Sequence, residues 1–391
     1  MVKGKVVYCV ESMDQENTIK KLGGIGIITS TDLQSDLADT TLILGTTVSS
    51  KDGMNIDRYI SSSKKPEVSI SKTRDVRVLA PFVASFSASG PQSISPNIFK
   101  VQSCLFILAL LYHYLLTLRH ILHHPRIVLC FLCLNPGIQP DILAPGLGIL
   151  AGYSKIPSVT GDPTDTRHSI FKILSGTSMA CPHAVATAAY VKSMHMDWSP
   201  AAVRSALMTT ATPVKVENRL DELSIGSGQI NPVRASDPGL VYDIGMKSYI
   251  SLLCYEGHND TMIGLLIGGK TKFSCSSLKS AHGVDGINYP SLHIQLKNTS
   301  KVSGVFFRTV TNVGSSKSVY TATVMPPQGL NVEVIPRKLT FDRPGQKQSF
   351  KVIVKGAIKN SRKKSEVVTG SIAWSDSKHV VRSPMLIYVG R

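Results

Sequence analysis

The alternation of hydrophobic and polar positions over residues 1–78 predicts a mixed α/β unit. Apolar, β-branched runs predict strands, whereas a 3.6-residue spacing followed by glycine predicts a helix that stops. By these patterns we expect strands in KVVYCV (5–10) and GIGIITS (24–30), a pair of strands in TTLILGTTVS (40–49), a half-buried strand in PEVSISKTRDVRV (66–78), and short helices in ENTIKKLGG (16–24) and MNIDRYISSS (54–63).

The pattern changes after residue 78. The segment 80–91 predicts a strand followed by a Gly-Pro loop, and 140–153 predicts a buried apolar segment broken by Pro145 and Gly146. Helices are predicted from Gly176 onward, and the second of them has a clear start signal. Ser199 is its expected N-cap and Pro200 its first helical residue.

The hydrophobic pattern changes again in the C-terminal part of the chain. Residues 214–286 predict a loop-rich connection with short helices, among them KSYISLLCYEG (247–257). From residue 288 to 391, about seven short alternating strands separated by turn residues predict an antiparallel β-sandwich of the immunoglobulin or fibronectin kind.

Residues 101–139 do not fit their surroundings. They are strongly apolar and contain no acidic residue. The uncharged run 104–118 is shorter than the ~20 residues of a spanning helix, so we expect no membrane segment there. The insert begins with valine and ends with glutamine, whose codons can supply the GT and AG of an intron. We interpret it as a retained intron.

Composition adds little that is specific. The net charge is +17, which suits an acidic partner, but basic residues are scattered and not interleaved with aromatics. We therefore expect no nucleic-acid partner. Cys130 and Cys133 have metal-ligand spacing without a second pair, which favours two incidental cysteines. We expect neither a metal nor a cofactor.

Ser178, in SGTSMACPH (175–183), is the candidate for chemistry. A serine hydroxyl needs a base to remove its proton and donors to hold the oxyanion. The free backbone N–H groups of a first helical turn supply such donors. The competing interpretation is a small-residue N-cap on a buried helix.

Several motifs in order give the chain a resemblance to a family. GTSMACPH (176–183), PDILAPG (140–146) and DWSPAAVRSALMTTA (197–211) resemble segments of subtilisin-like serine proteases. With VKGKVVYC, GIGIITS and the final sandwich, the chain resembles plant subtilases of the cucumisin type. In that subfamily a protease-associated domain interrupts a parallel-sheet catalytic domain, and a fibronectin-III-like domain follows.

The resemblance implies a domain plan and site residues. It implies a partial protease-associated domain (1–78), the C-terminal part of a subtilisin-like α/β catalytic domain (79–243), a connector (244–287) and a fibronectin-III-like β-sandwich (288–391). By the same resemblance Ser178 is the acylating serine and its N–H contributes to the oxyanion hole. His183 is then a supporting helix residue, and Cys254 and Cys275 are a disulfide pair.

The resemblance also implies what the chain lacks. The family's catalytic aspartate and histidine and its oxyanion asparagine precede the inserted domain, so we expect them to be absent here. Asp162, Asp165 and His168 lie close together in sequence, but a new triad there would need accurate placement by chance. We expect a peptidase by family that is inactive alone.

The alternative is a non-catalytic protein-binding fragment. Either function has a protein or peptide as its partner, and the family suggests homodimerisation through the protease-associated domain of the full-length protein. We expect an extracellular location, in the apoplast or cell wall, although the chain shows no signal peptide. Asn259 and Asn298 lie in sequons and are the candidate N-glycosylation sites.

Overall fold

The structure is a computed structural model, and it divides the chain into two compact units. It describes residues 2–10, 15–32, 36–37, 40–72, 74, 80–87, 89–90, 140–216, 219–255, 257–268, 274–277, 287–297, 301–358 and 366–390. The first unit comprises residues 1–87 and 145–179, and the second comprises 88–144 and 180–391.

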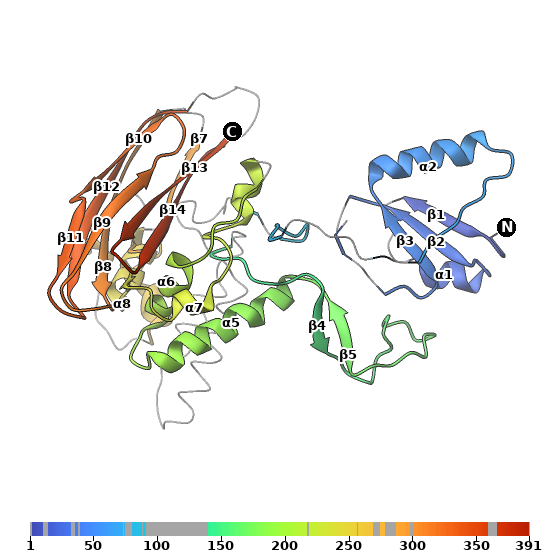
Figure 1. Cartoon of the computed structure of the whole chain (residues 1–391), viewed down its shortest axis with the longest axis horizontal. Coiled ribbons are helices and arrows are strands. Elements are labelled where there is room, and N and C mark those ends of the chain that lie inside the picture. Colours follow the sequence, from blue (N-terminus) through green and yellow to red (C-terminus); the bar gives the residue numbers. More distant parts are fainter. Residues whose placement is uncertain are drawn as a thin grey trace. The chain divides into compact units, whose positions relative to one another are not determined.

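The first unit is built on a three-stranded parallel sheet (Figure 1). Its strands β1 (Val6–Val10), β2 (Gly26–Ser30) and β3 (Leu44–Val48) lie in that order. The central strand β2 is buried along its whole length, because β1 and β3 flank its edges and the two helices of this unit contact it. Helix α1 (Glu16–Lys21) follows β1, and helix α2 (Ser50–Ser62) follows β3.

Helix α2 is longer than the sequence predicts because its start signal was missed. The Ser49 side chain accepts a hydrogen bond from the Asp52 N–H, so the helix begins directly after Ser49. The expected pair of strands around Gly45 is wrong for the same reason: β3 is a single strand that leads straight into this cap.

Two further strand predictions are wrong for the residues that the structure describes. Residues 66–72 form no strand although they alternate, and neither do the described residues of 80–90. In the first case the backbone finds a side-chain partner, because Glu67 N–H donates to the Tyr59 hydroxyl at 3.0 Å. An alternating pattern predicts a strand only where a neighbouring strand can accept its hydrogen bonds.

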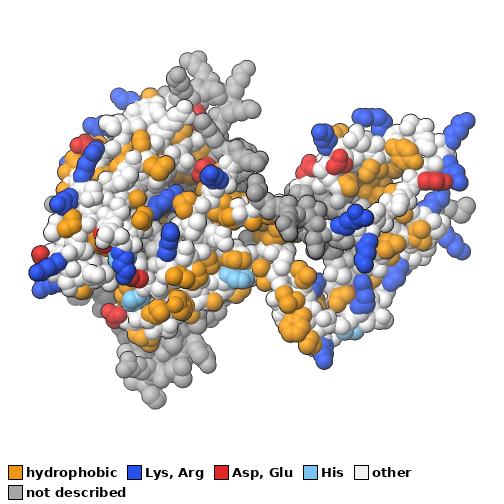
Figure 2. All heavy atoms as spheres, in the orientation of Figure 1, with side chains coloured by type: hydrophobic (Ala, Val, Ile, Leu, Met, Phe, Trp, Pro, Cys, Tyr) orange, Lys and Arg blue, Asp and Glu red, His pale blue; other side chains and the backbone are white. Residues whose placement is uncertain are grey.

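The first unit ends with a β-hairpin made of β4 (Ile149–Gly152) and β5 (Phe171–Leu174), which are antiparallel. The prediction that 140–153 is buried holds for 140–144, which are buried or half-buried, and is wrong for the hairpin, since Leu150 is 70% exposed and its cross-strand partner Ile173 is 60% exposed. Figure 2 shows hydrophobic side chains gathered in this part of the surface. Apolar composition alone did not reveal that one hairpin face faces solvent.

Two helices dominate the start of the second unit. Helix α5 (Thr177–Met194) runs from the end of the first unit, and helix α6 (Pro200–Thr209) follows it. Ser199 caps α6 as predicted, by accepting a hydrogen bond from Ala202 N–H at 3.0 Å. Their buried faces share a cluster with Trp198 and with Ala235 of the short helix α7 (Pro232–Ala235).

The connector forms a small helical module. Helices α8 (Met246–Tyr255) and α9 (Asp260–Leu266) pack around Ile250, Leu253 and Ile263. A disulfide joins Cys254 of α8 to Cys275 of the short 3-10 helix η2 (Cys275–Ser277), which is the pair that the resemblance implies.

The sandwich consists of two sheets, as the alternation predicts. One sheet has the order β10-β12-β8-β6 and the other β11-β9-β13-β14-β7. The strands are β6 (Leu240–Val241), β7 (Leu292–Lys297), β8 (Lys301–Asn312), β9 (Ser318–Met325), β10 (Leu330–Ile335), β11 (Lys338–Phe341), β12 (Lys347–Ala357), β13 (Glu366–Ser375) and β14 (Val380–Gly390).

Two features of the sandwich differ from a purely antiparallel arrangement. Strand β7 pairs in parallel with β14, and β6 comes from the region before the connector and pairs with β8. The core between the sheets is large and aromatic, with Phe306, Phe350 and Trp374 almost fully buried. This part of the chain therefore has a hydrophobic core of its own.

Candidate functional site

The segment before Ser178 is held by backbone and side-chain hydrogen bonds to the start of the β-hairpin. Gly176 N–H donates to the carbonyl of Gly146 at 2.8 Å, and Gly148 N–H donates to Ser175 Oγ at 2.9 Å. Gly176 has φ +147, a backbone conformation that residues with a Cβ atom rarely adopt. The turn before α5 therefore favours glycine at position 176.

Ser178 is the second residue of α5 and is exposed to solvent. Its backbone N–H belongs to the first helical turn, where no preceding carbonyl of the helix can accept it. The structure records no hydrogen bond from its hydroxyl to any residue that it describes. Hydroxyl and N–H therefore lie together at the positive end of a long helix.

Pro182 lies inside α5, five residues after its first residue Thr177, and not in the first helical turn. Proline has no N–H, so the carbonyl of Ser178 loses the donor that a residue four positions later would supply. Pro182 is exposed, and this position on the surface accommodates its ring. The missing backbone hydrogen bond therefore lies in the helical turn that contains Ser178.

His183 lies on the same helix five residues after Ser178. Five residues correspond to about 140° around a helix axis, so the two side chains leave α5 in different directions. The backbone carbonyl of His183 accepts a hydrogen bond from the Thr187 side chain, Oγ1, at 2.8 Å. That His183 supports the helix stays a prediction.

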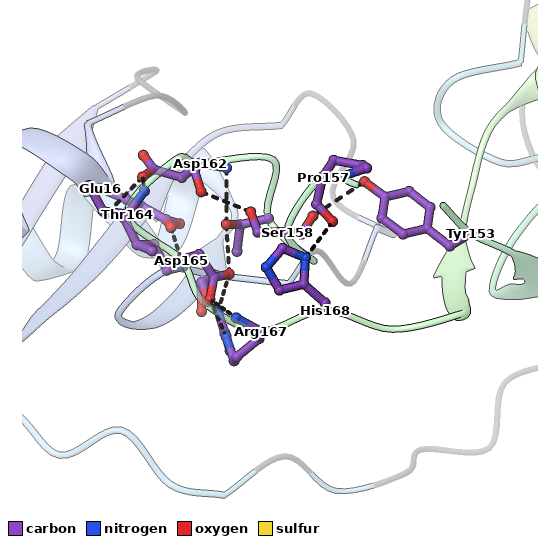
Figure 3. Close-up of polar contacts among 12 residues, drawn as sticks. Glu16, Tyr153, Pro157, Ser158, Asp162, Thr164, Asp165, Arg167 and His168 are labelled. Carbon is purple, nitrogen blue, oxygen red and sulfur yellow. Dashed lines mark hydrogen bonds and ion pairs between the residues drawn. The ribbon is translucent and has the colours of Figure 1, made fainter. Parts of the chain in front are cut away.

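Asp162, Asp165 and His168 do not form a triad, because each side chain bonds elsewhere in its own loop (Figure 3). Asp165 accepts hydrogen bonds from Arg167 Nε at 2.8 Å and from Thr160 Oγ1 at 2.8 Å. His168 Nδ1 lies 3.2 Å from the carbonyl of Pro157. The hydrogen bond from Arg167 lowers the pKa of Asp165, which keeps this carboxylate ionised as a structural anchor.

The same loop is attached to the parallel-sheet part of the first unit. Arg167 Nη2 donates to the carbonyl of Thr41 at 2.9 Å, so Arg167 bridges Asp165 to a segment far away in sequence. Asp162 accepts from Thr164, and these hydrogen bonds lower its pKa as well. We conclude that GDPTDTRH (161–168) is a structural loop.

The described residues contain neither a candidate metal site nor a candidate membrane span. Within the described ranges no cluster of His, Cys, Asp or Glu could hold a metal ion. No helix in those ranges is both long and apolar enough to cross a bilayer. Cys130, Cys133, Asn298 and the whole insert 101–139 lie outside the described residues.

Two family models match separate parts of the chain. The family model "Subtilase family" matches residues 132–228, and the model "Fibronectin type-III domain" matches residues 286–387. Subtilisin-like protease SBT4.15 of Arabidopsis thaliana is 47% identical over 99% of this chain. The chain belongs to the plant subtilisin-like proteases. Ser178 lies within the segment that the subtilase model matches.

Other plant subtilases match in the same way. Arabidopsis SBT4.14 is 42% identical over 99% of the chain, and SBT1.5 is 38% identical over the same share. The chain covers 47%, 46% and 48% of SBT4.15, SBT4.14 and SBT1.5, so it spans about half the length of these relatives. The FixG-related protein from Vibrio parahaemolyticus is 9% identical with a TM-score of 0.19, over 23% of this subtilase chain and 82% of its own.

The structure also contains a buried polar cluster that sequence reasoning missed in this subtilase. The Tyr289 hydroxyl donates to Asp141 Oδ1. Arg204 of α6 lies 4.6 Å from the centre of the Tyr289 ring and donates to the Tyr249 hydroxyl at 3.3 Å. The cluster ties the PDILAPG segment to α6, to α8 and to the residues just before β7.

The sequence held only a weak signal for this cluster. Arg204 is 9% exposed and Asp141 is 5% exposed, and charged residues in an otherwise apolar helix or motif are rarely buried unless paired. A charged residue among the small residues of AAVRSALM (201–208) is thus the pattern that indicates such a cluster. The identity of its partners could not be read from the sequence.

Proposed function

We propose that Ser178 is the nucleophile of a subtilase-type serine endopeptidase that cleaves peptide bonds through an acyl-enzyme. The observation that carries the proposal is the position of Ser178 within the segment matched by the subtilase family. It follows the Gly176 turn and lies at the N-terminus of α5. Its own N–H would stabilise the oxyanion of the tetrahedral intermediate.

We further propose that the 391 residues alone do not catalyse hydrolysis. The structure records no hydrogen bond between Ser178 and a histidine of the described residues. The chain spans about half the length of SBT4.15, which leaves room for a base and a second oxyanion donor elsewhere. Losing one oxyanion donor typically costs about 10²–10³ in turnover, and losing the base costs more.

A secreted, glycosylated protein fits this function. The Cys254–Cys275 disulfide suits an oxidising compartment outside the cytosol. Asn259 is exposed and caps α9 by accepting a hydrogen bond from Met262 N–H at 2.9 Å. That hydrogen bond uses Oδ1 and not Nδ2, which is the atom that a glycan would modify.

Two proposals concern the first 78 residues. The parallel sheet β1-β2-β3 with α1 and α2 would be part of a protease-associated domain, as the resemblance implies. Homodimerisation through this domain stays a prediction. A non-catalytic role in protein binding is the second candidate function, and the same experiment separates it from the first.

The experiment joins this chain to the part of SBT4.15 that it does not match, and treats the chimera with a fluorophosphonate probe. We expect rapid labelling at Ser178, which Ser178→Ala abolishes. Ser193→Ala is the matched control, because it removes an exposed serine hydroxyl from the same helix and should leave labelling unchanged. A folded chimera without label at Ser178 would favour the binding role.

A further inference from the structure

The outer face of the sheet β10-β12-β8-β6 carries an uneven distribution of charge. Alternation along the strands places Lys347, Lys351 and Lys355 of β12 on the side opposite the buried core residues Phe350, Val352 and Val354. Lys301 of β8 lies on the same side, at the exposed end of its strand. We call this side, defined by these four lysines, the lysine face.

The pairing of the strands fixes the order of side chains across the lysine face. Lys355 lies between Ser303 and Asn331, and Lys351 lies between Phe307 and Ile335. Positions four residues apart on a strand are about 13 Å apart, so the lysines of β12 form a line of evenly spaced positive charges. Glu333 of β10 is the acidic residue placed among them.

The three lysines of β12 have no recorded partner in the described part of the fold. The structure records no hydrogen bond or ion pair from the side chains of Lys347, Lys351 or Lys355 to the residues that it describes. Apolar side chains flank Lys351 on the two neighbouring strands and remain open to solvent, with Phe307 45% exposed and Ile335 38% exposed. A sheet face with a line of positive charges and an exposed aromatic ring is suited to an extended, negatively charged ligand.

We propose that the lysine face binds a linear polycarboxylate, that is, an acidic polysaccharide. A carboxylate on successive sugar units complements a line of point charges, and the C–H face of a sugar ring can rest on Phe307 and Ile335. Planar, two-point recognition of phosphate favours arginine, whereas the basic side chains on this part of the face are lysines.

The compartment supports the same class of ligand. The Cys254–Cys275 disulfide of the same unit suits an oxidising environment, where acidic polysaccharides are common polyanions and nucleic acids are not. A sequence-independent nucleic-acid groove would also need several aromatic side chains for base stacking, and Phe307 alone does not provide them. The proposal does not depend on whether Ser178 is catalytic.

The test measures binding of the full chain to immobilised polygalacturonate over a range of salt concentrations. We expect binding at low salt that is released as salt rises. The double variant Lys351→Gln with Lys355→Gln should reduce the slope of log affinity against log salt by about two, because two charge contacts are lost.

The matched control is Lys317→Gln with Lys338→Gln. It removes the same net charge from exposed lysines of the turn before β9 and of β11, outside the lysine face. We expect this control to retain the slope of the unmodified chain, with circular dichroism showing both variants folded. Equal losses in both variants would overturn the proposal, because net charge would then explain binding.

Two other results would also overturn it. The first is no binding to polygalacturonate at low salt. The second is tighter binding to a single-stranded oligonucleotide or to anionic phospholipid vesicles, with the same loss in the Lys351 and Lys355 double variant. The face would then serve a different class of polyanion.

Discussion

At the scale of single residues, the interior of the second unit depends on polar groups that must stay paired. Tyr289 is 3% exposed, and its ring and hydroxyl contact Arg204 and Asp141 respectively. Burial raises the pKa of Tyr289 well above its ordinary range, so it remains a neutral donor to the Asp141 carboxylate. A buried carboxylate that loses a donor is costly because water cannot replace it.

The first prediction follows from this pairing. Tyr289→Phe keeps the ring over Arg204 but removes the hydroxyl, and should lower the free energy of unfolding by about 1–3 kcal/mol. Urea denaturation would measure the change. Tyr190→Phe removes a hydroxyl from an exposed ring on α5 and is the control with little expected effect. Equal stability of Tyr289→Phe and the unmodified chain would refute the importance of the pair.

The second prediction concerns Glu222, next to the sandwich. Burial raises its pKa, while the nearby Arg382 and a hydrogen bond with Thr369 oppose that rise. A carboxyl with a raised pKa in the folded state costs stability once the pH exceeds its unfolded value of about 4.3. Glu222→Gln should therefore raise the melting temperature at pH 7 relative to the unmodified chain.

The pH dependence provides the control for Glu222. At pH values below about 4 both side chains are neutral, so the difference in melting temperature should disappear. Glu333→Gln, which changes an exposed carboxylate on β10, should not reproduce the gain at pH 7. A Glu222→Gln variant that is less stable at pH 7 would show that the pairing with Arg382 outweighs burial.

At the scale of elements, the sequence predicted those with local start or stop signals. Helix α6 begins after Ser199 and with Pro200, as its capping pattern indicates. The segment 66–72 alternates like a strand but has no neighbouring strand, and alternation cannot supply that information. The face on which an element is buried also depends on distant partners, as the exposed Leu150 of β4 shows.

The candidate site and the polar cluster also differ in how far the sequence predicts them. The position of Ser178 at a helix start could be predicted, because Gly176 and the small residues around it are a local signal. The pairing of Tyr289 with Asp141 joins residues 148 positions apart, and no local pattern predicts it. Contacts between residues so far apart in sequence are determined by the packing of the whole unit.

The third prediction tests the start of α6. Ser199 caps the helix and also donates to Asp243 Oδ1 at 2.6 Å. Ser199→Ala should cost about 1–2 kcal/mol in the free energy of unfolding, because an N–H of the first turn loses its partner. Ser193→Ala, whose hydroxyl only bonds back to the Tyr190 carbonyl, should cost much less in the same urea titration. Equal losses in the two variants would contradict the capping role.

At the scale of the whole molecule, the chain consists of two units with separate cores. The parallel sheet and the β4–β5 hairpin belong to the first, and the sandwich with α6 to α9 belongs to the second. Separate cores are expected to unfold in separate transitions. The disulfide lies entirely in the second unit.

The fourth prediction uses this division. Calorimetry of the full chain should show two transitions, and reducing Cys254–Cys275 should lower only one of them. A closed loop of this size, with a sequence separation of 21, contributes about 3 kcal/mol in the chain-entropy account. The Cys254→Ser and Cys275→Ser double variant should match the reduced protein. A single transition that shifts as a whole would contradict the two-unit description.

The proposal made above for Ser178 is that it is a subtilase-type nucleophile, and that these 391 residues alone do not hydrolyse peptides. The most direct measurement compares peptide hydrolysis by the purified chain with that by its Ser178→Ala variant. The account predicts no difference between them, at the background rate. Turnover by the unmodified chain that is lost in Ser178→Ala would contradict it.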